Sequence, residues 1–346
     1  MTQGNPPAKP KPETPPPPSP IPGFQLAVLK PSVELKHSSP LVCCRFDPTG
    51  KWLITASQDN ALQRWDLADS KKVDLAGHSS WVRAMVFTDD GKTLFTGGYD
   101  GQIISWPIST ALPEPARQIR AHDGWVRSMA FHGGKVVSCG NDGRVSILNA
   151  DELREIKGWQ AHDCHVYQVA FSSDGGKVLS ADHKGRVKVW DVDGKPVREF
   201  VLPGLHKYDT GFRADIGGVR SWSFSPDGNS LACAGITNVS NAFAGVGNPI
   251  IVLADWTTGK VRLELKPKEA FQGTMWGVAW NKAGFIAGAA GGNGGMLWFW
   301  KPDQSNEIFA HKLPENARDM AQSADGKKLA VAFQGGTVRV YPVAAG

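Results

Sequence analysis

The length, composition and charge of the chain favour a large all-β architecture and argue against a membrane-spanning or strongly nucleic-acid-binding protein. The 346 residues include 39 glycines and 13 tryptophans but few long apolar runs, which is typical of many short strands joined by tight turns. No stretch approaches the roughly 18 apolar residues of a membrane helix, the chain start lacks a secretory pattern, and a net charge of +5 is too small to diagnose nucleic-acid binding.

The first segment of the chain is rich in proline. Ten prolines fall within residues 1–22, including the run Pro15 to Pro18, so this segment cannot form a helix or an internal strand. We therefore expect residues 1–23 to be a disordered tail and residues 24–346 to form the folded domain. A plain spacer is the commoner role of such a tail, and recognition by a proline-binding module is the alternative.

The folded part repeats one sequence pattern at a spacing of about 40 residues. After His37 and after His78, a Thr follows at 18 residues, an Asp at 22 and a Trp at 28. A third copy begins at His122 and a fourth at His162, and divergent copies surround Val219, Met275 and Ala317. The repeat count is seven.

Each copy contains short segments of alternating apolar and polar residues separated by turn signals such as Asp90-Gly91 and Asp227-Gly228. This pattern predicts antiparallel strands joined by hairpins. Repeats of this length with four strands each bury their faces by stacking around an axis, so we predict an all-β, seven-bladed β-propeller. Val33-Glu34-Leu35 resembles an outer strand, and it is expected to complete the last blade, whose own strands end with Thr337 to Tyr341.

The chain resembles the WD-repeat family over residues 33 to 343. The dipeptide of that family stands at Trp65-Asp66 and Trp190-Asp191, and its opening Gly-His at Gly77-His78. The resemblance implies hydrogen-bonded tetrads in the first two copies, formed by His37, Thr55, Asp59 and Trp65 and by His78, Thr96, Asp100 and Trp106. In the third copy Leu148 replaces the Trp, in the fourth Lys184 occupies the Asp offset, and the last three copies lack most of the set.

One position of each copy is expected at the start of the innermost strand, which in WD-repeat proteins tends to line the mouth of the central channel. These seven residues, called the mouth residues below, are Val42, Arg83, Arg127, Tyr167, Arg220, Trp276 and Arg318. Two residues earlier stand Trp81, Trp125 and His165. Arginine matches carboxylates and phosphates, and both Arg and Trp are enriched at interface hot spots, so we predict a partner-binding surface here. The alternative is that the arginines stack on neighbouring blades or are merely solvated.

The fifth copy contains two insertions, His206 to Gly218 and Ile236 to Pro249. With Tyr208, Phe212, Arg213 and Phe243, both are expected to form a wall beside the channel mouth, although tolerated loop insertions would look the same. The stretch Asn238 to Gly247 is small and polar enough to be mobile.

The sequence contains no arrangement typical of a catalytic or metal site. There is no Gly-x-Ser-x-Gly elbow, the histidines show no ligand spacing, and the five cysteines are odd in number and scattered, which favours reduced thiols in the cytoplasm. We expect no cofactor and no metal.

The favoured function is a non-catalytic, monomeric scaffold that binds an acidic or phosphorylated peptide or partner loop at the mouth. One alternative is a propeller enzyme for a small anionic substrate that uses Tyr167, His165 and Asp319. Another is a polyanion binder, although the Phe-Arg-Arg-Gly motif of phosphoinositide-binding propellers is missing.

Overall fold

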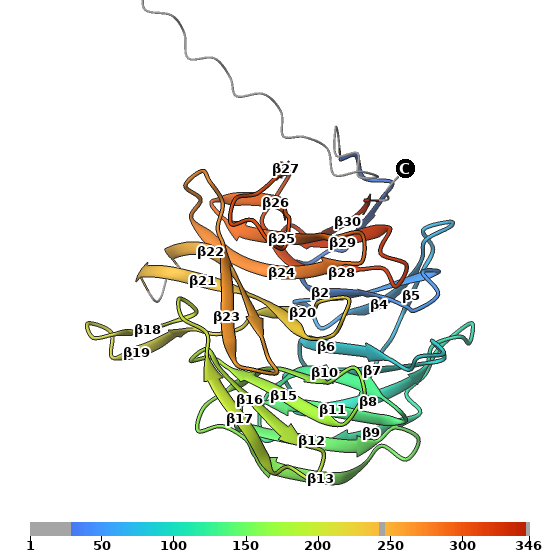
Figure 1. The fold of residues 1–346 in the computed structure, drawn as a ribbon. Coiled ribbons are helices and arrows are strands. Elements are labelled where there is room, and N and C mark those ends of the chain that lie inside the picture. Colours follow the sequence, from blue (N-terminus) through green and yellow to red (C-terminus); the bar gives the residue numbers. More distant parts are fainter. Residues whose placement is uncertain (1–28, 242–245, 344–346) are drawn as a thin grey trace, which may run out of the picture.

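The computed structural model describes residues 29–241 and 246–343 and shows a closed ring of seven four-stranded antiparallel sheets (Figure 1). The predicted seven-bladed propeller is thereby confirmed, and the described residues contain no helix that could cross a membrane. The predicted tail, residues 1–23, lies outside the described residues.

Blades 1 to 4 follow one another along the chain, each running from its innermost to its outermost strand. Blade 1 consists of β2 (Leu41–Phe46), β3 (Trp52–Ser57), β4 (Leu62–Asp66) and β5 (Lys72–Asp74). Blade 2 consists of β6 (Val82–Phe87), β7 (Thr93–Gly98), β8 (Gln102–Pro107) and β9 (Arg117–Arg120). Blade 3 consists of β10 (Val126–His132), β11 (Lys135–Gly140), β12 (Arg144–Asn149) and β13 (Arg154–Gln160). Blade 4 consists of β14 (Val166–Phe171), β15 (Lys177–Asp182), β16 (Arg186–Asp191) and β17 (Pro196–Val201).

The remaining blades contain the insertions and the ring closure. A separate hairpin of β18 (His206–Asp209) and β19 (Ala214–Gly217) precedes blade 5, which consists of β20 (Ser221–Phe224), β21 (Ser230–Asn241), β22 (Val246–Asp255) and β23 (Lys260–Leu265). Blade 6 consists of β24 (Gly273–Asn281), β25 (Phe285–Gly292), β26 (Gly294–Trp300) and β27 (Phe309–Leu313). Blade 7 consists of β28 (Ala317–Gln322), β29 (Lys328–Phe333), β30 (Thr337–Pro342) and, as its outermost strand, β1 (Val33–Lys36).

The two ends of the folded chain close the ring by sharing blade 7, as the sequence predicts. Strand β1 pairs with β30 from Val33 opposite Val340 to Lys36 opposite Thr337. Leu35 is buried there in the apolar cluster between blades 7 and 1. This pairing removes the strand edge that an open array would leave exposed.

The core is divided among the interfaces between blades. Seven buried apolar clusters are found among the described residues, and each joins two consecutive blades, including blade 7 to blade 1. Successive side chains of a strand point to opposite faces of the sheet, and each face of a blade packs against a neighbouring blade. Central strands such as β3, with five of six residues buried, are therefore apolar on both faces. The innermost strands therefore stand side by side around a central channel.

Candidate functional site

The first two predicted tetrads differ in their hydrogen bonds. The second is complete: the ring nitrogens of His78 lie 3.0 Å from Asp100 Oδ2 and 2.8 Å from Thr96 Oγ1, and Trp106 Nε1 donates to the same hydroxyl at 2.8 Å. In the first, His37 Nε2 lies 2.5 Å from Thr55 Oγ1, and Trp65 Nε1 donates to that oxygen at 2.8 Å. Asp59, however, accepts hydrogen bonds from Ser57 and Ser38 instead of from His37.

The fourth blade has a complete tetrad that the sequence did not predict. His162 lies 2.9 Å from Asp182 and 2.8 Å from Ser180, and Trp190 Nε1 donates to Ser180 at 2.9 Å. The expectation that Lys184 leaves this set without an acid is therefore corrected. Its acid comes from the last residue of β15, two positions earlier than Lys184. In blade 3, His122 bonds Asp142 and Ser138, and Leu148 fills the Trp position.

This difference between the two aspartates has a measurable consequence. Asp182 is fully buried and accepts hydrogen bonds from His162, from Arg186 Nε at 2.7 Å and from two backbone N–H groups, whereas Asp59 is exposed. Removing Asp182 leaves buried donors and a cation without their acceptor. We expect Asp182→Ala to lower the free energy of unfolding by about 2–3 kcal/mol and Asp59→Ala by about 1 kcal/mol or less, measured by urea denaturation. Equal losses would contradict the assignment of the fourth tetrad.

The tetrad histidine of blade 1 makes stability depend on pH. Burial, aided by the charge of Lys72, lowers the pKa of His37 to about 4. Because the folded protein keeps this ring neutral while the unfolded chain binds a proton near pH 6.5, its contribution is complete above pH 6.5 and is lost as the pH falls toward 4. Between pH 7 and 5, wild type should lose on the order of 1 kcal/mol more stability than His37→Gln, since the other histidines titrate in both proteins. Parallel pH profiles of the two melts would contradict this.

The mouth residues are set apart from the sheets by β-bulges. In six blades the register between the innermost strand and its neighbour shifts across one residue, and that residue is Val42, Arg83, Arg127, Tyr167, Trp276 or Arg318. In blade 5, Arg220 directly precedes β20 and its N–H donates to Ala234 O at 2.8 Å. A bulge turns a side chain out of the regular alternation. Six of the seven blades thus present one residue separately from the ladder, a feature that the sequence prediction missed.

Arginine and aromatic side chains alternate along much of this set. The guanidinium carbon of Arg127 lies 4.5 Å from the ring centre of Trp125 and 4.7 Å from that of Tyr167. Arg220 lies 4.8 Å from Tyr167 and 5.6 Å from Trp276, and Arg318 lies 5.7 Å from Trp276. The arginines therefore do stack across neighbouring blades, the arrangement that the sequence left as the alternative to binding. Stacking holds the planar groups while leaving their N–H edges available.

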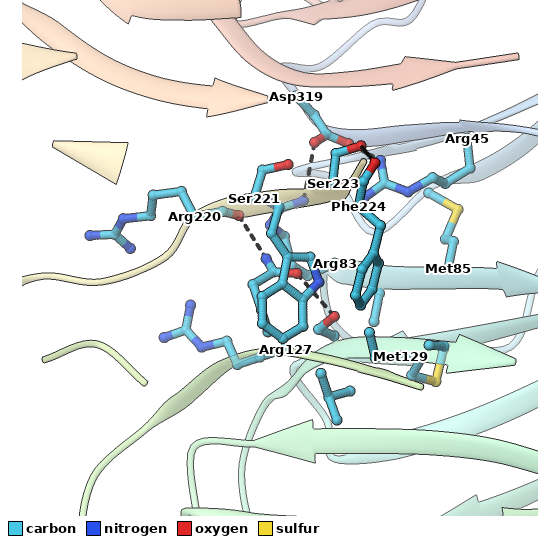
Figure 2. A pocket seen from close by; sticks show the side chains of 17 residues that line it. Arg45, Arg83, Met85, Arg127, Met129, Arg220, Ser221, Ser223, Phe224 and Asp319 are labelled. Atoms are coloured by element: carbon cyan, nitrogen blue, oxygen red, sulfur yellow. Dashed lines mark hydrogen bonds and ion pairs between the residues drawn. The ribbon is translucent and has the colours of Figure 1, made fainter. Parts of the chain in front are cut away.

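The channel contains a cavity of about 300 Å³ lined by Arg45, Arg83, Arg127, Arg220 and Asp319, among others (Figure 2). Figure 2 shows Arg127 and Arg220 extending toward one end of this cavity and Arg45 lying toward the other. Four guanidinium groups and one carboxylate give the lining a positive charge. Arg45 was not among the predicted residues.

Among the described arginines of the channel, Asp319 forms ion pairs with two, Arg45 and Arg83, and with none of the others. Asp319 is buried, lies 2.5 Å from Arg45 Nη1 and 3.7 Å from Arg83 Nη1, and accepts the N–H of Cys44 at 3.0 Å. Burial lowers the pKa of Arg83, but the charge of Asp319 together with smaller contributions from neighbouring groups outweighs burial, and the net shift is upward. Asp319 thus offsets one of the two positive charges of Arg45 and Arg83 within the channel wall, with Arg45 the closer partner.

Arg127, Arg220 and Arg318, called the cationic arc below, have no such partner among the described residues. No carboxylate of the described residues forms an ion pair with any of the three. The buried Nε atoms of Arg220 and Arg318 also lack a hydrogen-bond acceptor. Only Arg127 Nε is satisfied, by Asn141 Oδ1 at 2.6 Å. Burial lowers the pKa of Arg127 and of Arg318, which is the effect of taking a cation out of water without a counter-charge. An anion would supply the missing acceptors.

The aromatic residues predicted beside the mouth also come together. Trp125 is 38% exposed and stacks on Tyr99 with ring centres 3.8 Å apart, and Trp81 lies 5.7 Å from Tyr99. His165 lies on the next blade, with its ring 5.6 Å from that of His183. These flat surfaces adjoin Arg127 and extend the mouth over blades 2 to 4.

The three candidate catalytic residues each contact different groups. Asp319 is bound to Arg45 and Arg83, Tyr167 lies between two guanidinium groups, and His165 contacts His183. No hydrogen bond joins any two of them in the described structure. This geometry gives no support to an acid-base site built from them.

One group of metal-type ligands occurs in the described residues, formed by Asp163, Cys164 and Asp182. Its centre is already taken by a cation of the protein. Arg186 contacts Asp163, donates from Nε to Asp182 at 2.7 Å, and lies 3.4 Å from Cys164 Sγ. The guanidinium group therefore satisfies these ligands, and burial raises the pKa of the Cys164 thiol to about 12, which disfavours the thiolate that a metal needs.

Comparison with known proteins identifies the repeat. Residues 29–66, 70–107, 113–149 and 153–191 match the family model described as "WD domain, G-beta repeat". Each match begins in or before an outer strand and ends on the third strand of the next blade, because the sequence repeat is offset from the blade by one strand. The same offset is what lets β1 complete blade 7.

Several curated proteins share part of this chain. Apoptotic protease-activating factor 1 of Rattus norvegicus is 28% identical over 204 residues, 58% of this chain and 16% of that protein. WD repeat-containing protein SL1-17 of Schistosoma mansoni is 25% identical over 210 residues, 57% of this chain and 64% of that protein. Nuclear distribution protein PAC1 of Arthroderma benhamiae is 30% identical over 89 residues, 25% of this chain and 19% of that protein. The chain spans less than two thirds of each of these relatives.

Proposed function

We propose that this chain, four of whose repeats match the WD-repeat model, is an interaction scaffold whose channel mouth holds an acidic or phosphorylated segment of a protein partner. Propellers of WD repeats are typically non-catalytic scaffolds, which supports this proposal. The observation that carries the proposal is the cationic arc, with two buried Nε–H groups that have no acceptor in the described structure. An arginine fork pairs with carboxylate or phosphate through two parallel hydrogen bonds. We propose that the scaffold is a monomer and is not an enzyme.

The surroundings of the arc support protein recognition in particular. Trp125, Tyr167 and Trp276 flank the arginines, and interface hot spots are enriched in Arg, Trp and Tyr. These aromatic residues hold the guanidinium groups in place, so less side-chain entropy is lost on binding.

The test replaces the arc and compares it with exposed arginines of the outer strands. The charge-reversed triple variant Arg127→Glu, Arg220→Glu, Arg318→Glu should lose affinity capture of partners from a lysate of the source cells, because both attraction and hydrogen bonding are removed. Arg83 is left unchanged because it forms an ion pair with Asp319. The matched control Arg117→Glu, Arg154→Glu, Arg198→Glu has the same change of charge on exposed positions of β9, β13 and β17 and should capture the same partners.

The outcome also separates the alternatives. Equal capture by wild type and by the arc variant would contradict the proposal. Binding that falls equally in both triple variants, and collapses between low and moderate salt, would favour a general polyanion binder such as one for nucleic acid.

A further inference from the structure

The β18–β19 hairpin contacts β21, and we call the hairpin together with residues 236–241 of β21 and residues 246–249 of β22 the fifth-blade wall (Figure 1). We infer that this fifth-blade wall is the second half of the partner site and takes an aromatic or large apolar side chain next to the acidic group held by the cationic arc. The inference rests on the proposed function, because it concerns the same partner.

The wall is fixed on both sides. Lys207 of β18 donates from Nζ to Val239 O of β21 at 2.6 Å, which joins the hairpin to blade 5. Asp215 of β19 lies 3.3 Å from Lys184 Nζ, which joins it to blade 4. Asp209 accepts the N–H groups of the turn at 2.9 and 3.1 Å. These ties make the hairpin a preorganised surface.

The pairing register determines which side of the hairpin faces the mouth. Lys207 points to β21, so its strand neighbour Tyr208 lies on the opposite face. Tyr208 pairs with Asp215, and cross-strand partners share a face. Since Asp215 contacts Lys184 in the turn after β15, the Tyr208 face is turned toward blade 4. The aromatic residues beside the mouth directly precede the first strands of blades 2 to 4: Trp81 at blade 2, Trp125 at blade 3 and His165 at blade 4.

The base of the hairpin is packed directly against a mouth residue. A Cβ atom at Gly218 would lie 2.6 Å from His183 Cα and 2.8 Å from Tyr167 Cδ2, so only glycine allows this approach. Tyr167 is the ring that lies between Arg127 and Arg220. The base of the wall therefore adjoins the ring that separates two arginines of the cationic arc.

The chemistry of the wall indicates what it binds. Tyr208 is 52% and Phe212 47% exposed, and they stand only four positions apart on this hairpin. Lys184, Lys207 and Arg213 lie around them with the carboxylates Asp209 and Asp215, and the ion pair between Lys184 and Asp215 leaves a net charge of about +1 that suits an acidic segment. A specific protein interface buries about 1,000 Å² or more, which is more than a channel mouth alone offers, so a partner must extend over neighbouring surface.

The experiment uses fluorescein-labelled peptides and the full chain, with affinity measured by fluorescence anisotropy. One probe is a hexaglutamate peptide, and the others add one tryptophan after a glycine-serine spacer of increasing length. We expect at least one spacing to bind about tenfold more tightly than hexaglutamate alone, because the indole reaches the wall. The variant Tyr208→Ser, Phe212→Ser should remove this gain while leaving hexaglutamate binding unchanged. A matched control, Val197→Ser, Val201→Ser, replaces two similarly exposed residues of β17 and should keep the gain.

The inference is overturned if no spacing gains more than about twofold, or if the gain survives in the Tyr208→Ser, Phe212→Ser variant. In either case, hexaglutamate binding that is lost in the arc variant would leave the proposed function standing. Failure of every peptide to bind wild type would overturn both.

Discussion

A chain that begins at residue 37 is expected to melt on the order of 10 °C below a chain that begins at residue 29. The shorter chain lacks β1, so β30 loses its partner from Thr337 to Val340 and Leu35 leaves the cluster between blades 7 and 1. Ser32 and its N–H bond to Val340 O at 2.8 Å are lost as well. Burying a leucine contributes about 1.5–3 kcal/mol and each hydrogen bond about 1 kcal/mol, which together give a loss of roughly 5 kcal/mol or more.

The comparison is made by calorimetry on both chains, and the chain from residue 29 serves as the control because it keeps everything that the closure uses. A synthetic peptide of residues 29–40, added in excess, should raise the melting temperature of the shorter chain by binding at the open edge. Coincident melts of the two chains would mean that the ring holds without β1.

Replacing Asp319 by alanine is the second change with a large expected effect, a loss of about 3–5 kcal/mol in the free energy of unfolding. The carboxylate is 1% exposed and connects blade 7 to Cys44 and Arg45 of blade 1 and to Arg83 of blade 2. Its removal leaves two confined cations without a counter-charge and one buried N–H without an acceptor. Urea denaturation of wild type and Asp319→Ala measures the loss.

A double variant identifies the cause of that loss. Asp319→Leu with Arg45→Met replaces the pair by apolar groups and should recover part of the stability, since a buried ion pair contributes little more than a well-packed apolar pair. The mouth of Asp319→Ala is more positive than that of wild type, so acidic peptides should still bind. A cost below about 1 kcal/mol for Asp319→Ala would show that the two arginines do not depend on this carboxylate.

The repeat pattern was sufficient to predict the ring because the seven copies each specify the same local unit. The blade number followed from the equal offsets after His37 and His78 and from the alternating segments. The closure through β1 followed from the extra strand before His37. The same offsets misled at Asp182, because Lys184 was placed by its distance from His162. In blade 4 the acid stands at the end of β15, two positions after Ser180, whereas in the first two copies it is expected four positions after the Thr.

The bulges interrupt the alternation of buried and partly exposed residues along the innermost strands. In β2 the buried residues are Leu41, Cys43, Cys44 and Phe46, so the alternation is interrupted directly after Val42. The same interruption occurs in β6 and β28. The role of Asp319, in contrast, had no local signal. Its partner Arg45 is 274 positions away, and only ring closure brings blades 7 and 1 together.

We propose that Arg127, Arg220 and Arg318 form an anion-binding mouth, while Arg45 and Arg83 belong to the channel wall. NMR of the arginine Nε–Hε groups tests it directly, with the hexaglutamate peptide as the titrant and single arginine variants for assignment. Saturable shifts of the Arg220 and Arg318 signals are expected, with no comparable shift for Arg45 or Arg83. Unchanged Arg220 and Arg318 signals, or equal shifts at the outer-strand residues Arg117 and Arg198, would contradict it.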